Sequence, residues 1–344
     1  MEAKRTSSVI RRIGVVVLGV VALALLLAAA LAFSSSDRLR TLASIRQVDG
    51  YPLYVMHYYG DYGLRAYAPA TRPSSRPWPE GELGAPDMAC TCFASLSPQG
   101  DRQFGRSFDW YDRASLLLFT HPRQGYASVS MVDIAYLGFR SKGPSLLERG
   151  KLLSTPYWPF DGLNERGLAV GMMAVPSAAP SQDPEKTTIG SLLAMRLVLD
   201  YCANVEEAIA LLDHYNIDFR GGPPLHYLVA DAAGNSAVLE FVDGQMNVLR
   251  ATEPWQVATN FALSGTSFAP DQAPCARYQA AYDALSRAGG RISQEEAMAI
   301  LERVSQQTTM WSVAYNMTSG EVRCAMGRRY DQVKGFGLSM RKVP

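Results

Sequence analysis

CTCFASLSPQGDRQFGRSFD, residues 90–109, is the stretch of this chain that decides the fold. Two runs suited to β-strands, Cys92–Leu96 and Arg102–Arg106, flank a Pro-Gln-Gly-Asp turn at residues 98–101. The stretch is therefore predicted to form a β-hairpin. Because an antiparallel hairpin brings its two ends together, the residues at its start and at its end are expected to be neighbours.

The two ends of this hairpin carry side chains that suit nucleophilic catalysis. Cys90 stands at the start, and Arg106 and Asp109 stand at the end. If the chain were cut between Ala89 and Cys90, the new α-amine, with a pKa of about 7.7–8.0, could accept the proton of the adjacent thiol. The guanidinium of Arg106 would favour the thiolate, and Asp109 could accept a hydrogen bond from the α-ammonium or the thiol.

The same stretch carries a resemblance to a known family. Residues 90–91, CT, followed by residues 105–109, GRSFD, resemble the C-T … G-R-N-x-D signature of the linear amide C–N hydrolases, including its Cys-to-Arg spacing. This family of N-terminal-nucleophile enzymes includes bile salt hydrolases, penicillin V acylases and, more distantly, acid ceramidase. The resemblance continues through most of residues 90–327.

Four further segments resemble family motifs, in the family's order. They are Asp161–Leu168 for D-G-x-N-E-K-G-L, Leu225–Asp231 for L-H-W … D, residues 259–260 for T-N, and Ala276–Tyr278 for S-R-F. Each motif is weak alone. The five motifs together, in the right order, are a strong signal.

The resemblance implies an α+β protein with the four-layer αββα fold of N-terminal-nucleophile hydrolases. It also implies that Cys90 becomes the nucleophile after the preceding segment is lost. Arg106, Asp109, Asn260 and Arg277 would form the rest of the site, with Asn260 helping to bind the oxyanion. No cofactor is expected, and the substrate would be a small-molecule N-acyl amide whose linear, non-peptide C–N bond is hydrolysed through an acyl-enzyme.

The order of predicted elements independently favours an α+β fold. Blocks of strands and helices, rather than strict βαβ alternation, are typical of antiparallel sheets with helices on their outer faces. Helices are predicted at Ile189–Cys202, from Asn204 onward, at Cys275–Ala288 and at Ser293–Val304, and Asn204 with Glu207 and Ser293 with Glu296 have capping-box spacing. Further strands are predicted at Leu116–Thr120, Ala127–Ile134, Leu168–Val175, His226–Ala230, Ala237–Phe241, Met246–Arg250, Val257–Asn260, Trp311–Thr318 and Glu321–Ala325.

Two positions depart from the family pattern. Ser107 stands where the family usually has asparagine. Ala174 stands where bile salt hydrolases have a second oxyanion asparagine and penicillin V acylases a tyrosine, so that donor is missing here. Met172 and Ala174 share one face of a predicted strand. If that face lines the pocket, the acyl group of the substrate is expected to be apolar; the alternative is that Met172 is an ordinary core residue.

Each candidate residue also has a plainer interpretation. The first cysteine of the motif could be buried or disulfide-bonded, and Cys92, on the same strand face, could be the nucleophile instead. Arg106 and Asp109 could form a surface salt bridge, Asn260 could serve a turn, and Arg277 could be an exposed helix residue. The motif series favours the catalytic interpretation, and for Cys92 it favours a structural or disulfide role.

The N-terminus has the pattern of an export segment. Lys4, Arg5, Arg11 and Arg12 precede an uncharged apolar run from Gly14 to Phe33, and about 20 such residues can span a bilayer as a helix. Basic residues on the N-terminal side predict that this end stays cytoplasmic. A cleaved signal peptide is the alternative, since residues 30–32 resemble an A-x-A site. Either way, the rest of the chain is expected outside the cytoplasm, membrane-anchored or secreted.

Three regions follow from these patterns. Residues 1–33 are interpreted as the anchor or signal segment, 34–89 as a linker and pro-segment, and 90–344 as the cysteine amidase domain. Tyr51–Tyr67 is expected to form a strand that shields the site. Pro69–Pro86, rich in proline, is expected to be an exposed connector that precedes the cut.

Composition narrows the classes of function. A net charge of +1 gives no reason to expect a nucleic-acid partner. The four histidines are scattered and predict no metal site, and five cysteines leave at least one without a disulfide partner in the chain. Three alternatives to a hydrolase stay open: an acyltransferase on the same fold, a non-catalytic cell-surface binding module, and a thiol redox protein using Cys90 and Cys92. A homo-oligomer is compatible with the sequence.

Overall fold

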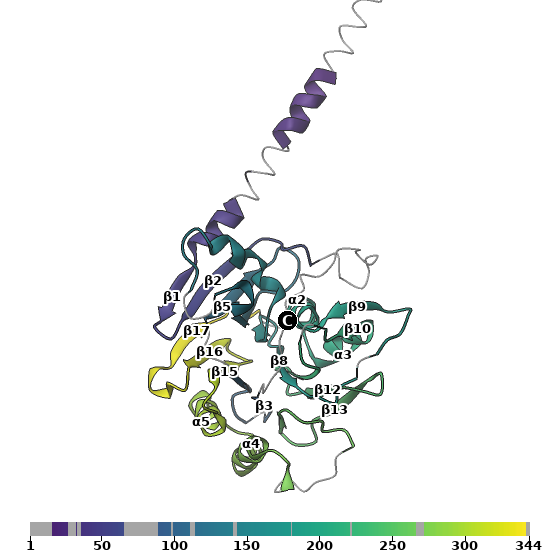
Figure 1. Ribbon diagram of the computed structural model, residues 1–344, viewed down its shortest axis with the longest axis vertical. Helices are drawn as coiled ribbons and strands as arrows, with labels where there is room; N and C mark the ends of the chain where they lie inside the picture. Colours follow the sequence, from purple (N-terminus) through teal and green to yellow (C-terminus); the bar gives the residue numbers. More distant parts are fainter. Residues whose placement is uncertain are drawn as a thin grey trace, which may run out of the picture.

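The computed structural model of the protein describes residues 16–26, 32, 36–64, 89–97, 99–110, 114–139, 143–179, 181–220, 222–265 and 272–341. Two β-sheets face each other at its centre, and most of the buried apolar side chains lie between and around them. Figure 1 shows helices on the outer side of each sheet.

The larger sheet has nine strands in the order β1-β2-β5-β6-β7-β8-β11-β12-β13. Strands β2 and β5 are parallel, and the other neighbouring pairs are antiparallel. The strands are β1 (Arg46–Asp49), β2 (Leu53–Tyr59), β5 (Ser115–His121), β6 (Ser128–Asp133), β7 (Asp161–Asn164), β8 (Ala169–Ala174), β11 (Leu225–Ala230), β12 (Ser236–Val242) and β13 (Gln245–Arg250).

The smaller sheet has six antiparallel strands in the order β14-β3-β4-β15-β16-β17. They are β3 (Ala89–Ser95), β4 (Gln103–Asp109), β14 (Trp255–Ala258), β15 (Thr309–Asn316), β16 (Glu321–Met326) and β17 (Lys334–Gly337). Every residue of β4 is buried. This follows from its position, because one face of the sheet meets the larger sheet and the other meets helices.

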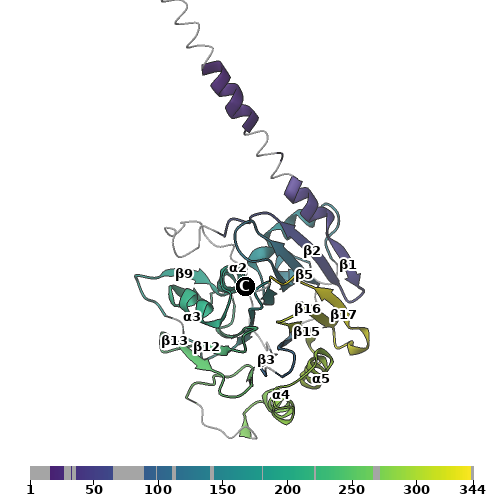
Figure 2. The same ribbon diagram turned by 180° about the vertical axis from the view of Figure 1, so that it is seen from behind.

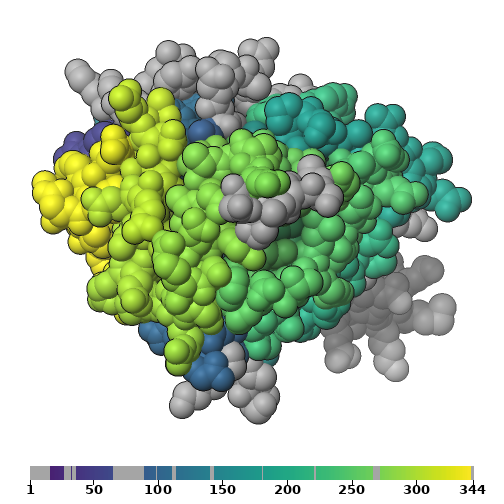
Figure 3. Space-filling view, turned by 90° about the horizontal axis from the view of Figure 1, so that it is seen from below, coloured from purple at the N-terminus to yellow at the C-terminus, as the bar shows by residue number. Residues whose placement is uncertain are grey.

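Two helices cover each sheet. On the larger sheet lie α2 (Ser191–Tyr201) and α3 (Val205–Asp213), with the short parallel pair β9 (Thr187–Gly190) and β10 (Tyr215–Asp218) beside them; on the smaller sheet lie α4 (Ala276–Arg287) and α5 (Gln294–Val304). Short 3-10 turns fill the connections at η2 (Ile134–Leu137), η3 (Arg149–Tyr157) and η5 (Tyr330–Gln332). On the face seen in Figure 3, the yellow-green α4–α5 segment lies beside green residues of the β11–β14 segment. The layers are therefore helix, sheet, sheet, helix, which confirms the predicted four-layer αββα architecture.

Both predicted helix starts are capped as their sequences indicate. The side chain of Asn204 accepts a hydrogen bond from the backbone N–H of Glu207. Ser293 and Glu296 form a reciprocal capping box. These caps satisfy N–H groups that the first turn of a helix leaves without an internal partner.

The segment before the hairpin is part of the larger sheet. Residues 36–43 are helical where a linker was expected, and Figure 2 shows β1 and β2 beside β5 at one edge. Strand β2 pairs with β5 from Leu53 to Tyr59. The predicted tyrosine-rich strand is therefore present, but it is a strand of the larger sheet and not a separate segment that shields the site. The predicted connector Pro69–Pro86 lies outside the described residues.

At the extreme N-terminus, residues 16–26 form a helix whose side chains are exposed. Within the described residues, no helix combines the length and the apolar character that crossing a membrane requires. The apolar run from Gly14 to Phe33 lies partly outside the described residues, and its role as an anchor or signal stays a prediction.

Candidate active site

The predicted hairpin is the strand pair β3–β4. In its register Cys90 lies opposite Phe108, and Cys92 lies opposite Arg106. Directly opposed residues point to the same face of a sheet, and a Cβ placed on Gly171 of the larger sheet would lie 2.8 Å from the Cys92 sulfur. Both cysteines and Arg106 are therefore buried between the two sheets. The structure thus brings the guanidinium of Arg106 close to the thiols of both Cys90 and Cys92, as the hairpin predicted.

Arg106 is held in place from the opposite sheet by Asp161. Its Nε lies 3.8 Å from Oδ2 of Asp161 at the start of β7, and both side chains are fully buried. Asp161 in turn accepts hydrogen bonds from Trp311 Nε1 at 2.9 Å and from the Tyr315 hydroxyl at 2.5 Å. Burial alone would lower the pKa of Arg106, but the two neighbouring thiols and Asp161 raise it above its ordinary value. A fixed cation therefore stands beside the thiols, where it favours a thiolate.

Asp109 ends β4 opposite Ala89, the residue before Cys90. Its Oδ1 accepts hydrogen bonds from the hydroxyls of Ser107 at 3.0 Å and Thr309 at 2.5 Å. Its Oδ2 is buried and has no hydrogen-bond partner among the described residues. Burial raises the pKa of Asp109. One carboxylate oxygen of Asp109 is therefore available on the residue that pairs with Ala89, beside the predicted cleavage site between Ala89 and Cys90.

Asn260, just after β14, reaches the backbone of Cys90. Its Oδ1 accepts hydrogen bonds from the Cys90 N–H at 2.5 Å and from Arg277 Nη2 at 3.0 Å. Its Nδ2 donates to the carbonyl oxygen of Ala174 at 3.0 Å. These partners fix the orientation of the amide, because a flipped amide would turn its NH₂ group toward two donors. Nδ2 keeps a second hydrogen, which it can donate to a substrate oxyanion formed beside the Cys90 thiol.

Arg277, the second residue of α4, completes the ring of contacts around Cys90. Its Nη1 donates to the carbonyl oxygen of Cys90 and, at 3.2 Å, to the hydroxyl of Thr91. Its side chain is half-buried rather than exposed. Neither Asn260 nor Arg277 is therefore a simple turn or surface residue.

Cys92 has the structural position that was expected for it, without a disulfide. All five cysteines are free thiols. Burial raises the pKa of Cys92, although Arg106 acts in the opposite direction. Its sulfur packs so closely on β8 that only a glycine fits at position 171. The thiol form of Cys92 therefore serves packing between the sheets.

The interpretation of Met172 as a pocket residue is wrong. Met172 lies opposite Tyr227, whose hydroxyl donates to the Ser191 carbonyl in α2 at 2.8 Å. Met172 therefore points toward the helix layer, while its neighbour Gly171 points toward the smaller sheet. It is a core residue, because β8 is buried on both faces. Ala174 contributes its backbone carbonyl to the site, and its methyl group supplies no hydrogen-bond donor.

Asp161, His226 and Glu240 are buried near the site and were not among the residues that the sequence indicated. Asp161 and His226 belong to the quoted motif segments, so the motifs contained the signal. Glu240 has no motif; its only signal is a carboxylate inside the apolar run of β12.

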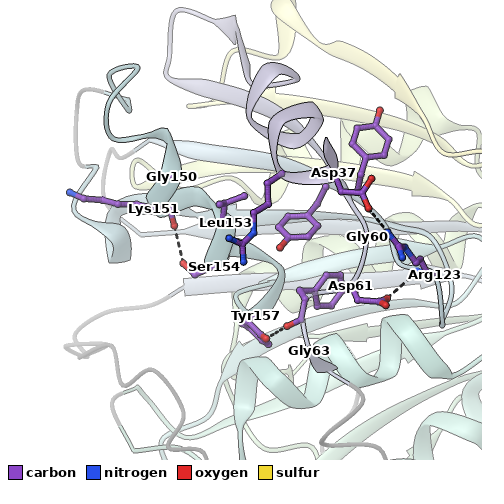
Figure 4. Close-up of a pocket in the computed structure, with 14 residues that line it drawn as sticks. Asp37, Gly60, Asp61, Gly63, Arg123, Gly150, Lys151, Leu153, Ser154 and Tyr157 are labelled. Carbon is purple, nitrogen blue, oxygen red and sulfur yellow. Dashed lines mark hydrogen bonds and ion pairs between the residues drawn. The ribbon is translucent and has the colours of Figure 1, made fainter. Parts of the chain in front are cut away.

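A surface pocket of about 840 Å³ lies elsewhere (Figure 4), between the helix at residues 36–43, the end of β2 and η3. Arg123 is ion-paired with Asp37 at its rim, at 2.6 Å. None of the five candidate residues lines this pocket. It is therefore separate from the hairpin site.

Comparisons with known proteins support the same region. A family profile described as "Linear amide C-N hydrolases, choloylglycine hydrolase family" matches residues 90–264. A penicillin V acylase of Pectobacterium atrosepticum is 29% identical over 194 residues, which cover 51% of this chain and 50% of that protein. The chain thus matches about half the length of this relative.

Solved structures show the fold. A crystal structure of a variant of the conjugated bile acid hydrolase from Clostridium perfringens has a TM-score of 0.54 at 18% identity, covering 72% of this chain and 92% of that chain. A second variant of that hydrolase has a TM-score of 0.52 at 17% identity, with the same coverage. These likenesses confirm the fold of N-terminal-nucleophile hydrolases for this chain.

Proposed function

Because this chain belongs to the linear amide C–N hydrolases of the choloylglycine hydrolase family, we propose that it hydrolyses the amide bond of an N-acyl amide with Cys90 as the nucleophile. The observation that carries the proposal is the convergence on Cys90 of Arg106, Asn260 and Arg277, from three different elements. A purely structural cysteine has no need of two arginines and an amide around it.

The proposal requires cleavage of the bond between Ala89 and Cys90. The N–H of Cys90 already lies at hydrogen-bond distance from Asn260, and the unused oxygen of Asp109 lies on the residue opposite Ala89. After cleavage, the same nitrogen would be an α-amine held by Asn260, and Asp109 would be available to bind its ammonium form. One residue would then provide both the nucleophile and the base.

The reaction would proceed in two stages. In the first, the α-amine accepts the thiol proton, the Cys90 sulfur bonds to the amide carbon, and the C–N bond breaks as the leaving nitrogen takes that proton. In the second, water attacks the thioester, the free acid leaves, and the proton from water restores the thiol. Arg106 would stabilise the thiolate of Cys90 in the first stage.

The oxyanion of each tetrahedral intermediate would be bound by Nδ2 of Asn260. Its second hydrogen is available, since the first is donated to the carbonyl of Ala174. Such a donor is worth about 10²–10³ in kcat because it acts on charge that develops only in the transition state. The methyl side chain of Ala174 cannot donate a hydrogen bond to the oxyanion, so any further donors would be backbone N–H groups.

We propose that the acyl group of the substrate is apolar. Phe108, opposite Cys90, stacks on Trp311 at 4.3 Å between ring centroids and meets Phe160 edge to face. Tyr136 stacks on both Phe160 and Trp158, and it is itself half-buried, so the aromatic cluster reaches one partly exposed position. Aromatic rings offer large apolar contact areas. Two similar proteins are named for a conjugated bile acid and for penicillin V.

An extracytoplasmic location is also part of the proposal. Its support is the basic start of the chain followed by the apolar run from Gly14 to Phe33. An N-terminal anchor would hold the enzyme close to lipophilic amides. Fractionation of cells into membrane, soluble and secreted material, with detection of the domain in each, tests this part separately.

A hydrolysis panel tests the activity. N-acyl amino acids of increasing chain length, conjugated bile acids, penicillin V and short peptides should be compared by kcat/KM, with the Cys90→Ala variant as the blank. We expect preferred cleavage of N-acyl amides with apolar acyl groups. Preferred cleavage of peptides, or equal turnover by the Cys90→Ala variant, would overturn the proposal.

A further inference from the structure

A buried pair of ionisable side chains contacts the backbone of the segment that carries Asn260. His226 of β11 and Glu240 of β12 occupy opposed positions next to the Tyr227–Leu239 pair, and Nδ1 of His226 lies 3.1 Å from Oε1 of Glu240. Both side chains are almost wholly inaccessible to solvent. The catalytic scheme above uses neither of them.

The hydrogen bonds of His226 indicate that it carries two ring protons. Its Nε2 lies 2.8 Å from the carbonyl oxygen of Thr259, which can only accept. Its Nδ1 faces Glu240, which is also an acceptor when ionised. Both contacts are satisfied together when both ring nitrogens bear hydrogen, as in an imidazolium–carboxylate pair.

Glu240 binds the far end of the same segment. Its Oε1 accepts from the Leu263 N–H at 2.6 Å, and its Oε2 accepts from the Ser264 N–H at 2.8 Å. Burial alone would raise the pKa of Glu240, but the hydrogen bonds from His226 and from this segment lower it to about 2. The pair therefore forms hydrogen bonds to both ends of the segment 259–264, at Thr259 and at residues 263–264. Asn260 lies between these two points.

We propose that the His226–Glu240 pair is a positioning device that sets Asn260 at hydrogen-bond distance from Cys90. The inference rests on the proposed function, because it assigns a purpose to the placement of Asn260. His226 and Glu240 touch neither the thiol nor the substrate in this scheme. They act through the backbone of residues 259–264.

The physical case for a positioning role is that stability alone does not account for the pair. A buried ion pair loses so much hydration that apolar residues of similar volume are often as stable. What an ion pair with four directional hydrogen bonds adds is a defined backbone position. The amide of Asn260 must be held in a fixed position, because misplacement of a reacting group by about 1 Å can cost about 10²-fold in rate.

A double-mutant cycle tests the inference on the full chain. We expect His226→Gln to lower kcat about 10-fold to 100-fold with little change in KM, as loss of a group that orients a functional side chain does. In the Asn260→Ala background, His226→Gln should have almost no further effect, because there is no amide left to position. Equal losses in the two backgrounds would overturn the positioning role.

Tyr227→Phe is the matched control. It removes a buried hydrogen bond to a backbone carbonyl from the adjacent residue of β11, on the opposite face. Its effect should be small and the same in both backgrounds. If His226→Gln does not fold, Glu240→Gln, which keeps the side-chain shape, takes its place in the cycle.

A second measurement does not depend on activity. Hydrogen exchange should show faster exchange of the Leu263 and Ser264 amides in Glu240→Gln than in wild type or Tyr227→Phe. Unchanged exchange would refute the positioning role. A failure of the proposed function would instead appear as absent amide hydrolysis in the wild-type protein, with the difference in exchange rates unaffected.

Discussion

Oδ1 of Asn260 accepts a hydrogen bond from the backbone N–H of Cys90 at 2.5 Å, across 170 residues of sequence. The same oxygen accepts from Arg277, which also binds the carbonyl of Cys90. The backbone of Cys90 is thus held on both sides, by a residue that follows the neighbouring strand β14 and by a residue in the first turn of helix α4. A site that holds the nitrogen of its nucleophile is ready to hold an α-amine.

The two cysteines of the hairpin should differ sharply when they are replaced. Cys90→Ala should abolish hydrolysis, whereas Cys92→Ala should retain much of it, because Cys92 serves packing and burial disfavours its thiolate. Loss of the Cys92 sulfur should cost about 1–2 kcal/mol in the free energy of unfolding. Steady-state kinetics and urea unfolding of both variants measure this. An inactive Cys92→Ala variant that is folded, beside an active Cys90→Ala variant, would show that the wrong cysteine has been assigned.

The ion pair between the sheets should be essential for stability. Asp161→Asn keeps the shape of the side chain but leaves the fully buried cation of Arg106 without a counter-charge. We expect a loss of about 3–5 kcal/mol in the free energy of unfolding. Chemical denaturation measures it, and Asp213→Asn, which removes a carboxylate from an exposed ion pair, is the control. A loss no larger than that of the control would contradict the account of Arg106.

The parts of the fold that could be predicted from the sequence are those fixed by neighbours along the chain. The hairpin of residues 90–109 and the caps at Asn204 and Ser293 depend on local turn and capping chemistry, and all three are present. The motif order added the four-layer architecture and brought the candidate residues to one place. Local patterns and motif order thus carried most of the site.

Contacts between layers could not be predicted in the same way. The alternation along β8 separates Met172 from Gly171, but it does not say which face meets the other sheet, and the Met172 interpretation failed for that reason. The link between Arg106 and Asp161 joins two sheets and has no local pattern. The parallel pairing of β2 with β5 is likewise non-local, so the sequence of the segment before the hairpin gave no sign of its place in the sheet.

Asp200 predicts a pH dependence of stability. Burial raises its pKa to about 6, against the opposing effects of Arg196 and the Tyr62 hydroxyl. Because this lies above the unfolded value of about 3.9, the stabilising contribution is fully present below about pH 4 and is lost as the pH rises through about 6. Relative to Asp200→Asn, the wild type should therefore lose on the order of 3 kcal/mol over this range.

Urea unfolding of wild type and Asp200→Asn at several pH values from 4 to 7 measures that difference. Taking the difference between the two proteins removes the contributions of other titrating groups. A difference that is constant with pH, or that changes in the wild type's favour as the pH rises, would show that Asp200 does not titrate as described.

The segment before the hairpin should stay bound after cleavage at Cys90. Leu53, Val55 and Met56 of β2 are fully buried in the larger sheet, and each such side chain contributes about 1.5–3 kcal/mol. Tyr62 adds a buried hydrogen bond to Asp200. Size-exclusion chromatography of the cleaved protein should show the two fragments together under native conditions and apart in denaturant. Active protein that has lost the residue 36–64 fragment would contradict this.

The N-terminal residue of the active protein tests the central claim most directly. Intact-mass measurement of protein purified from the fraction that hydrolyses N-acyl amides should show a chain whose first residue is Cys90, since only then does the nitrogen beside Asn260 become an α-amine. A processing-deficient Cys90→Ala protein should keep the uncut chain. Full activity in a protein that still carries Ala89 on Cys90 would contradict the account.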